Sequence, residues 1–254
     1  MTENDFTTPR RVAIFGGTFD PFTVAHRAIC KQAMDEMPID KLYIIPTVVS
    51  YHREGKDRWL CNADRVKVVR SMLWSLGEEY MGKWEVDTHE LELQSLCEKS
   101  DEQNNRGRDD RLYDSIIEPR RFVHTLLDFK TRVGLDTKID LILGTDSARN
   151  FATWYHWQDV AANVSAFVIV QGRDGKEVKT LPFEVARKLH RKSGVPSCSM
   201  DIPEEFQDVS ASKIRKRIEH GYYTVDDYLA EVKSFDNGEE SLNRLGWTEK
   251  KGKK

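Results

Sequence analysis

The sequence has no long apolar stretch, which excludes a transmembrane helix from the expected architecture. Its longest apolar runs, such as Ala166–Val170, have the length of a strand, whereas a helix needs about 20 apolar residues to cross a bilayer. Residues 1–9 are polar and acidic and lack the basic and apolar regions of a secretory signal peptide. We therefore expect a cytoplasmic protein with no membrane partner.

Cysteine is also scarce, with four residues in a chain of 254. Cys30, Cys61, Cys97 and Cys198 lie far apart and form no Cys-x-x-Cys pair, which argues against a disulfide framework or a zinc cluster. The net charge of -3 gives no general attraction to nucleic acid or anionic lipid. We expect no nucleic-acid partner, and any anion site must be local.

The chain does contain enough apolar sequence for one large domain. Hydrophobic residues make up 39% and charged residues 32% of the sequence, as in ordinary globular domains. We expect a flexible leader over residues 1–10, one domain over residues 11–235 and a polar tail over residues 236–254. The polar composition of residues 99–111 predicts an exposed insertion within that domain.

Apolar runs and helical patterns alternate along the chain. The expected strands cover residues 11–15, 42–45, 84–87, 139–143, 166–170 and 197–202. The expected helices cover residues 24–37, 62–76 (with Asn62 as the N-cap), 122–133, 183–191, 211–220 and 225–234. This alternation predicts an α/β fold with a Rossmann-like, doubly wound parallel sheet and C-terminal helices. In such sheets ligands bind beyond the carboxyl ends of the strands, so the loops that leave the strands are the candidate sites.

The first loop, residues 16–26, follows the first expected strand. Gly16 and Gly17 allow the backbone to turn sharply and to approach a ligand closely. The helix that follows presents unpaired N–H groups, which attract phosphate. Thr23 and His26 are three residues apart, so both can face the opening and donate hydrogen bonds to phosphate oxygens. The alternative is an ordinary strand-to-helix turn with a surface histidine.

The middle loop, residues 144–157, offers contacts for a nucleoside. Gly144 allows close approach of the backbone, and Asp146 can accept hydrogen bonds from ribose hydroxyls. Trp154 and Trp157 supply flat rings that can stack on a base. Core packing is the alternative role for these two rings.

The last loop, residues 209–217, precedes an amphipathic helix. Ser210 is the expected N-cap, and a basic cluster follows. Cations at a helix N-terminus are locally unfavourable, and a bound phosphate reverses that effect. The alternative is a capped surface helix whose basic residues are solvated. The cluster consists of Lys213, Arg215, Lys216 and Arg217.

These loops together resemble the nucleotidylyltransferase superfamily and, within it, the nicotinate/nicotinamide mononucleotide adenylyltransferases. Residues 16–26 are similar to the T/H-x-G-H signature, with Thr23 at its first position and Ala25 in place of glycine. Residues 209–215 are similar to the I-S-S-T-x-I-R motif, with Ala211 in place of one serine. Residues 45–53 resemble the L-P-T-x-x-P-P-H-K segment.

The resemblance implies a role for each matching residue. It implies that catalysis involves Thr23, His26 and Arg215, and that Trp157 is structural. The implied ATP-binding residues are Gly16, Gly17, Thr18, Phe19, His26, Gly144, Asp146, Ser210, Ser212 and Arg215. The implied mononucleotide-binding residues are Thr18, His52, Arg53 and Trp154. Residues 121–126 match the family's Y-T-x-D-T-L segment only at Thr125 and Leu126, which leaves the choice of pyridine substrate open.

The implied reaction is transfer of AMP from ATP to nicotinate or nicotinamide mononucleotide, with release of pyrophosphate, in NAD biosynthesis. Mg²⁺ is expected to bind through the ATP phosphates, with no metal ligand supplied by the protein. One alternative is a superfamily member that acts on pantetheine phosphate or an alcohol phosphate. Another is a nucleotide-sensing domain with weakened catalysis. The sequence does not indicate an oligomeric state.

Overall fold

The computed structural model describes residues 11–48, 59–93, 121–170, 181–207, 209 and 211–219, together with residues 224, 227, 228 and 230. The expected leader, the insertion at 99–111 and the tail at 236–254 lie outside these residues, as does most of the helix expected at 225–234. None of the helices in the described ranges is long and apolar enough to cross a membrane.

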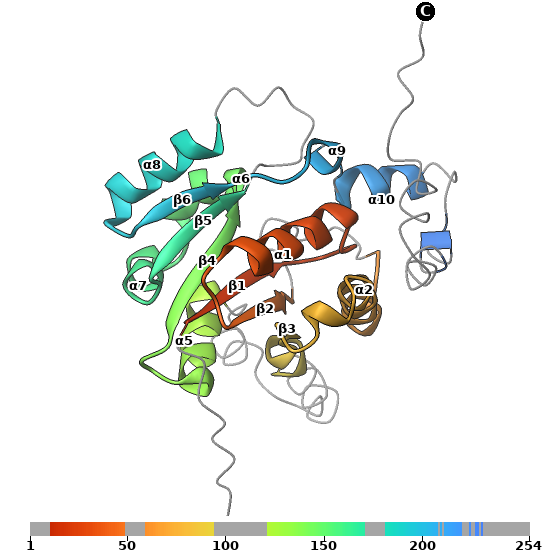
Figure 1. Cartoon of the computed structure of the whole chain (residues 1–254), viewed down its shortest axis with the longest axis horizontal. Helices are drawn as coiled ribbons and strands as arrows, with labels where there is room; N and C mark the ends of the chain where they lie inside the picture. The colour runs from red at the N-terminus through yellow and green to blue at the C-terminus, as the bar shows by residue number, and fades with distance from the viewer. Residues whose placement is uncertain are drawn as a thin grey trace, which may run out of the picture.

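A sheet of six strands forms the centre of the molecule (Figure 1). All five pairs of neighbouring strands are parallel, and the strand order is β3-β2-β1-β4-β5-β6. The strands are β1 (Arg11–Gly17), β2 (Lys41–Pro46), β3 (Trp84–Val86), β4 (Lys138–Gly144), β5 (Ala166–Val170) and β6 (Ser197–Met200). The predicted doubly wound parallel sheet is confirmed.

The strand order reverses between β1 and β4. From β1 the chain adds β2 and β3 on one side, and from β4 it adds β5 and β6 on the other side. Phe15 pairs with Ile142, so the loops that leave β1 and β4 start side by side. A reversal of this kind leaves a crevice at the carboxyl ends of the two strands, which is where such sheets bind ligands.

Helices cover both faces of the sheet (Figure 1). They are α1 (Val24–Glu36), α2 (Asn62–Trp74), α5 (Phe122–Val133), α6 (Thr145–Arg149), α7 (Trp157–Ala162), α8 (Pro182–Ser193), α9 (Glu204–Gln207) and α10 (Ala211–Glu219). The shorter 3-10 turns are η2 (Glu78–Tyr80) and η3 (Phe151–Thr153), and residues 89–93 are also helical.

Side chains of successive strand residues point to opposite faces and form two apolar cores. Ala13 and Phe15 of β1 pack into one core with α1, α2 and α10. Val12 and Ile14 pack into the other core with α5, α6, α7 and α8. Because both faces of the sheet are covered, β1 is apolar at every position from Val12 to Phe15.

The start of α2 differs from the sequence prediction. Cys61 is the N-cap and makes no capping hydrogen bond with its side chain, while Asn62 is the first helical residue. The Asn62 side chain instead accepts a hydrogen bond of 2.6 Å from Arg65 Nη2. Asn62 is therefore already part of the helix, and its side chain contacts Arg65 instead of capping the first turn.

Candidate nucleotide-binding site

The turn after β1 occurs at Phe19, not at the two glycines. Gly16 and Gly17 are the last residues of the strand, and Gly16 still pairs with Ile45. Phe19 has a φ of 49°, a left-handed conformation that non-glycine residues rarely adopt. A Cβ on Gly17 would lie 2.9 Å from the Phe19 ring, whereas one on Gly16 would make an ordinary contact of 3.7 Å with Phe122. Gly17 therefore provides room for Phe19, and the predicted glycine turn is wrong.

Thr23 is the N-cap of α1 and holds His26 in one orientation. The Thr23 main-chain N–H donates to His26 Nδ1 at 2.8 Å, and the Thr23 hydroxyl lies 3.0 Å from the same nitrogen. Because Nδ1 accepts a hydrogen bond from the main chain, the ring proton of His26 is on Nε2. The imidazole therefore has a donor on the side of the ring opposite to the cap.

The Thr23 side chain is placed differently from the sequence expectation. It is only 1% exposed, and its hydroxyl contacts the His26 ring and main-chain N–H. The expectation that Thr23 faces the opening is wrong, because an N-cap side chain folds back over the first turn of its helix. Ala25, which stands where the family has glycine, is fully buried in the core.

Three phenylalanine rings surround His26. The ring centroids of Phe15, Phe19 and Phe22 lie 5.9, 5.2 and 5.1 Å from that of the imidazole. Phe22 stacks on the imidazole with an interplanar angle of 29°. These contacts restrict the motion of the ring, and an apolar environment strengthens its hydrogen bond to a charged group.

Asp20 connects the first loop to two later segments. Its carboxylate is 3% exposed and accepts hydrogen bonds from the main-chain N–H groups of Trp59 at 3.2 Å and Leu60 at 2.9 Å. Its main-chain carbonyl accepts a hydrogen bond from Arg215 Nη1. Arg215 Nη2 donates to the Ser212 hydroxyl at 3.0 Å. The last loop is therefore in direct contact with the first.

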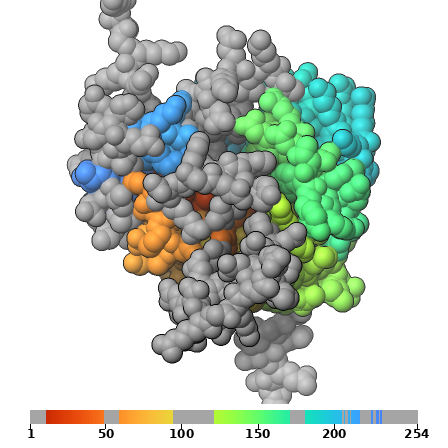
Figure 2. Space-filling view, turned by 180° about the vertical axis from the view of Figure 1, so that it is seen from behind, coloured from red at the N-terminus to blue at the C-terminus, as the bar shows by residue number. Residues whose placement is uncertain are grey.

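Figure 2 shows which described segments lie on the face opposite to the view of Figure 1. Seen from behind, the blue surface of α10 lies above the orange surface that includes α2 (Figure 2). The green surface of residues 145–165 lies across the same face of the molecule (Figure 2). A second contact joins the C-terminal part to the first loop, because the Tyr228 hydroxyl donates to the Phe22 carbonyl.

Arg65 is a functional candidate that the predicted site residues do not include, although residues 62–65 resemble the corresponding segment of the family. It lies in α2, is 0% exposed, and its Nη1 donates to the carbonyls of Thr18 and Thr47. The Thr47 N–H in turn donates to the Gly17 carbonyl at 2.9 Å. Arg65 therefore fixes the loops after β1 and β2 relative to each other. In the sequence, Arg65 could have been noticed as a charged residue on the apolar face of the predicted helix.

The middle loop begins α6 directly after β4. A Cβ on Gly144 would meet no atom within 4 Å, so the space beside this glycine is open. The Asp146 side chain is 59% exposed and lies 3.6 Å from Arg149 in an ion pair. Gly144 is the last residue of β4 and Asp146 lies in the helix that follows. Because β4 neighbours β1, both residues lie at the reversal of strand order.

The two tryptophans of the middle loop both pack against the same apolar core. The Trp154 ring lies 5.4 Å from Phe122 and 5.3 Å from Phe151. Phe122 is the residue that approaches Gly16, so Trp154 is linked to the first loop through one ring. The Trp157 ring lies 6.0 Å from Phe151. Phe151 in turn packs on Trp154, so Trp157 is linked to the first loop only through these additional rings.

The described part of the chain includes most of the predicted site residues. His52, Arg53 and Ser210 lie outside it. The first and last loops are in contact, and the middle loop is beside the first through β4 and Phe122. The predicted residues that the structure places are Gly16, Gly17, Thr18, Phe19, Thr23, His26, Gly144, Asp146, Trp154, Ser212 and Arg215.

The remaining histidines in the described ranges contact neighbours of their own. His89 Nε2 lies 3.2 Å from Asp128, and His156 Nδ1 lies 2.8 Å from Asp159. His124 Nδ1 accepts from the Arg121 main chain, and His190 Nδ1 lies 2.8 Å from the Val195 carbonyl. Within the described residues, no group of three or more His, Cys, Asp and Glu side chains could hold a metal ion.

A parallel sheet with a strand reversal at β1 and β4, flanked by a helix N-terminus, a histidine and an arginine, defines an α/β nucleotide-binding domain. Residues 14–217 match the model of the cytidylyltransferase-like family. The chain belongs to this family of nucleotidyltransferases.

Curated relatives and a solved structure extend the comparison. The chain is 27% identical over 217 residues to a protein of Aliarcobacter butzleri, with 84% of this chain and 90% of that protein covered. It is 24% identical over 237 residues to a protein of Marinobacter nauticus, with 87% and 94% covered. Both carry the name "Probable nicotinate-nucleotide adenylyltransferase". The fold matches Plasmodium falciparum nicotinic acid mononucleotide adenylyltransferase complexed with NaAD, with a TM-score of 0.54, 14% identity, and 93% and 96% of the two chains covered.

Proposed function

We propose that this protein transfers AMP from ATP to nicotinate mononucleotide and releases pyrophosphate, as a step of NAD biosynthesis. The observation that carries the proposal is the hydrogen bond from Arg215 to the Asp20 carbonyl. It joins the two segments that resemble the family's phosphate-binding motifs. The names of the curated relatives support nicotinate mononucleotide as the acceptor.

The triphosphate is bound by the first and last loops. The main chain of residues 16–19 and the N-terminus of α1 approach the phosphates, and His26 Nε2–H donates to an α-phosphate oxygen. Arg215, Ser212 and Ser210 bind the β- and γ-phosphates with the N-terminus of α10. Thr23 acts through His26, because its main-chain N–H keeps the proton of the imidazole on Nε2.

The other substrate groups lie beside the triphosphate. Gly144 and Asp146 contact the adenosine, and the open space at Gly144 leaves room for it. Thr18, His52, Arg53 and Trp154 bind the mononucleotide. The Trp154 ring stacks on the pyridine, and Arg53 contacts the 5′-phosphate with a fork of N–H groups.

Catalysis depends on positioning and charge stabilisation. The 5′-phosphate of the mononucleotide attacks the α-phosphorus of ATP, the new P–O bond forms, and the bond to pyrophosphate breaks. This nucleophile is already anionic near neutral pH, so it needs no general base. Holding two anionic reactants in line can lower a barrier by roughly 7–11 kcal/mol, and His26 and Arg215 offset the charge that develops on the phosphates.

Mg²⁺ enters with the nucleotide. The described residues assigned to the triphosphate are mainly N–H and cationic donors, which suit phosphate oxygens, and no group of three or more His, Cys, Asp and Glu side chains among the described residues could hold a metal ion. The ion would be held mainly by phosphate oxygens and water, the ligands that Mg²⁺ commonly keeps in nucleotide sites. It neutralises part of the triphosphate charge during the transfer.

The test is to incubate the purified protein with ATP and Mg²⁺ plus one acceptor at a time and to weigh the products by mass spectrometry. The acceptors are nicotinate mononucleotide, nicotinamide mononucleotide and pantetheine phosphate. The expected product is nicotinate adenine dinucleotide, formed with an equal amount of pyrophosphate and lost on chelation of Mg²⁺. A product from pantetheine phosphate, or ATP binding without any product, contradicts the proposal.

A further inference from the structure

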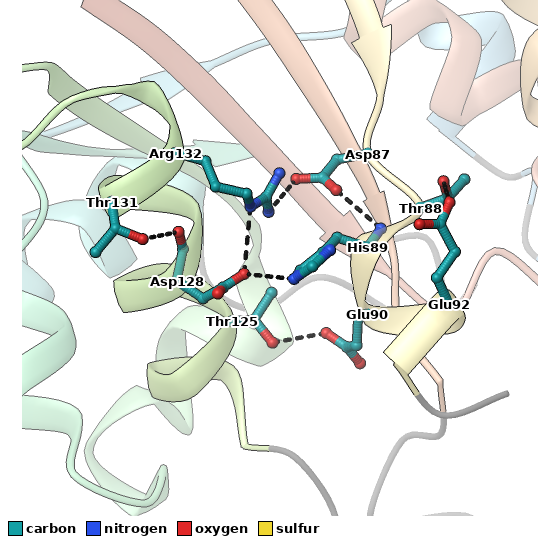
Figure 3. A network of polar contacts seen from close by, with 9 residues as sticks. All are labelled: Asp87, Thr88, His89, Glu90, Glu92, Thr125, Asp128, Thr131 and Arg132. Atoms are coloured by element: carbon teal, nitrogen blue, oxygen red, sulfur yellow. Dashed lines mark hydrogen bonds and ion pairs between the residues drawn. The ribbon is translucent and has the colours of Figure 1, made fainter. Parts of the chain in front are cut away.

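Glu90 is a buried carboxylate that joins the segment after β2 to helix α5. It lies in the helical residues 89–93 that follow β3, and it is 6% exposed. One carboxylate oxygen accepts a hydrogen bond of 2.9 Å from the Val48 main-chain N–H. The other accepts a hydrogen bond of 2.7 Å from the hydroxyl of Thr125, which is 4% exposed (Figure 3).

One partner of Glu90 begins a segment assigned to the mononucleotide, and the other lies in the helix that packs on Trp154. Val48 follows β2 at the start of the segment that continues to His52 and Arg53. Thr125 lies three residues after Phe122 in α5, so the two side chains share one face of that helix. Phe122 in turn packs on the Trp154 ring at 5.4 Å.

Thr47, the residue before Val48, is bound to the first loop and to α2. The Thr47 N–H donates to the Gly17 carbonyl at 2.9 Å, and the Thr47 carbonyl accepts from Arg65 Nη1 at 2.8 Å. Residues 47 and 48 are therefore the junction between the first loop on one side and α5 on the other. Glu90 supplies the contact on the α5 side.

We propose that Glu90 is a positioning residue for the pyridine mononucleotide, which sets the distance between the segment after β2 and the Phe122–Trp154 pair. This inference rests on the proposed function, because only that function assigns His52, Arg53 and Trp154 to the mononucleotide. A carboxylate with both oxygens engaged fixes two partners at once. Its removal leaves the part-buried Val48 N–H and the buried Thr125 hydroxyl without their acceptor and lets the two segments separate.

The segment after β3 and helix α5 have a second connection, which serves as a matched control. Arg132 in the last turn of α5 donates to Asp87 at 2.7 Å and to Asp128 at 3.3 Å, and His89 Nε2 lies 3.2 Å from Asp128 (Figure 3). Arg132 lies two turns or more beyond Phe122 along α5, at the opposite end of the helix from the Trp154 contact. Its loss should weaken the packing of α5 without moving the proposed pyridine site.

The test compares Glu90→Ala, Glu90→Gln and Arg132→Met in steady-state assays with ATP and nicotinate mononucleotide, with thermal unfolding of each variant. For Glu90→Ala we expect KM for the mononucleotide to rise roughly tenfold, since one lost buried contact has about that effect, while KM for ATP stays close to wild type. Glu90→Gln should restore most of the affinity, because its amide oxygen accepts from Val48 and its NH₂ donates to the Thr125 hydroxyl. Arg132→Met should lower Tm and leave both KM values close to wild type.

Thr125→Val provides a second variant if Glu90→Ala does not fold. Valine keeps the shape of threonine and replaces the hydroxyl with a methyl group. We therefore expect KM for the mononucleotide to rise selectively, by a smaller factor than in Glu90→Ala. Equal rises in both KM values, or unchanged KM values in an active protein, would overturn the role of Glu90 and leave the proposed function standing. A wild-type protein that forms no dinucleotide from any pyridine mononucleotide would overturn the proposed function and this inference with it.

Discussion

Arg215 in α10 donates a hydrogen bond to the main-chain carbonyl of Asp20, a residue 195 positions earlier in the chain. Asp20 lies in the loop between β1 and α1, and its carboxylate is fixed by the Leu60 N–H at 2.9 Å. The guanidinium of Arg215 is thereby held beside the loop that leads into α1, the helix that carries His26. The proposed reaction requires one triphosphate to reach both side chains.

Replacement of Arg215 by lysine should lower kcat strongly with little change in Tm. Lysine keeps one charge and loses the fork that contacts Asp20 and Ser212 together. Removal of one such donor from a transition state commonly costs about 10²–10³ in turnover. Steady-state kinetics and thermal unfolding measure the two effects. Lys216→Ala, an exposed position of the same helix, is the control, and an equal loss in that variant would argue for general charge attraction.

His26→Ala should reduce kcat by about 10²–10³, as expected for the loss of a donor to the α-phosphate. The imidazole is enclosed by three phenylalanine rings, so some loss of stability will accompany the change. Denaturant unfolding measures that part separately, and assays are run well below the unfolding range. Near wild-type turnover in a folded variant would remove His26 from the mechanism.

Thr23→Val separates helix capping from catalysis. The variant loses the capping hydroxyl, which should reduce the free energy of unfolding by about 1 kcal/mol. Turnover should fall much less than in His26→Ala, because the main-chain N–H at position 23 still donates to His26 Nδ1. Chemical denaturation and kcat are the two measurements. A loss of turnover as large as that of His26→Ala would give the Thr23 hydroxyl a direct role.

Gly17→Ala should mainly lower stability, whereas Gly144→Ala should mainly raise KM for ATP. A Cβ at Gly17 would lie 2.9 Å from the Phe19 ring, so overpacking should destabilise the protein by about 1–3 kcal/mol. A Cβ at Gly144 meets no atom within 4 Å, so stability should be unchanged. The same methyl group would meet a bound adenosine and raise KM for ATP. If Gly144→Ala changes neither stability nor KM, the adenosine lies elsewhere.

Trp154→Ala should mainly raise KM for the mononucleotide. The loss of ring stacking should cost about 0.5–1.5 kcal/mol of binding, which is roughly a twofold to twelvefold change in KM. Trp157→Ala is the matched control, because Trp157 packs on the same core and contacts Phe151. Kinetics with each substrate varied in turn distinguish the two. Equal effects from both variants would mean that Trp154 serves only the core.

Much of the fold was predictable because its signals are local. The helix predicted over residues 122–133 and the strand predicted over residues 166–170 have those bounds in the structure. The cap of α2 was predicted wrongly, since Asn62 is a favourable N-cap by type. In the structure its side chain is used by Arg65, and that competition depends on where α2 packs.

The sequence by itself determined the alternation of strands and helices, the parallel sheet and the order of the three loops that resemble family motifs. These features follow from apolar periodicity and short residue patterns, which act over a few residues. Only the tertiary structure decided that Arg215 contacts Asp20, that Arg65 joins the carbonyls of Thr18 and Thr47, and that Glu90 joins Val48 to Thr125. Buried polar groups require partners, and packing of the whole chain selects which distant residues provide them.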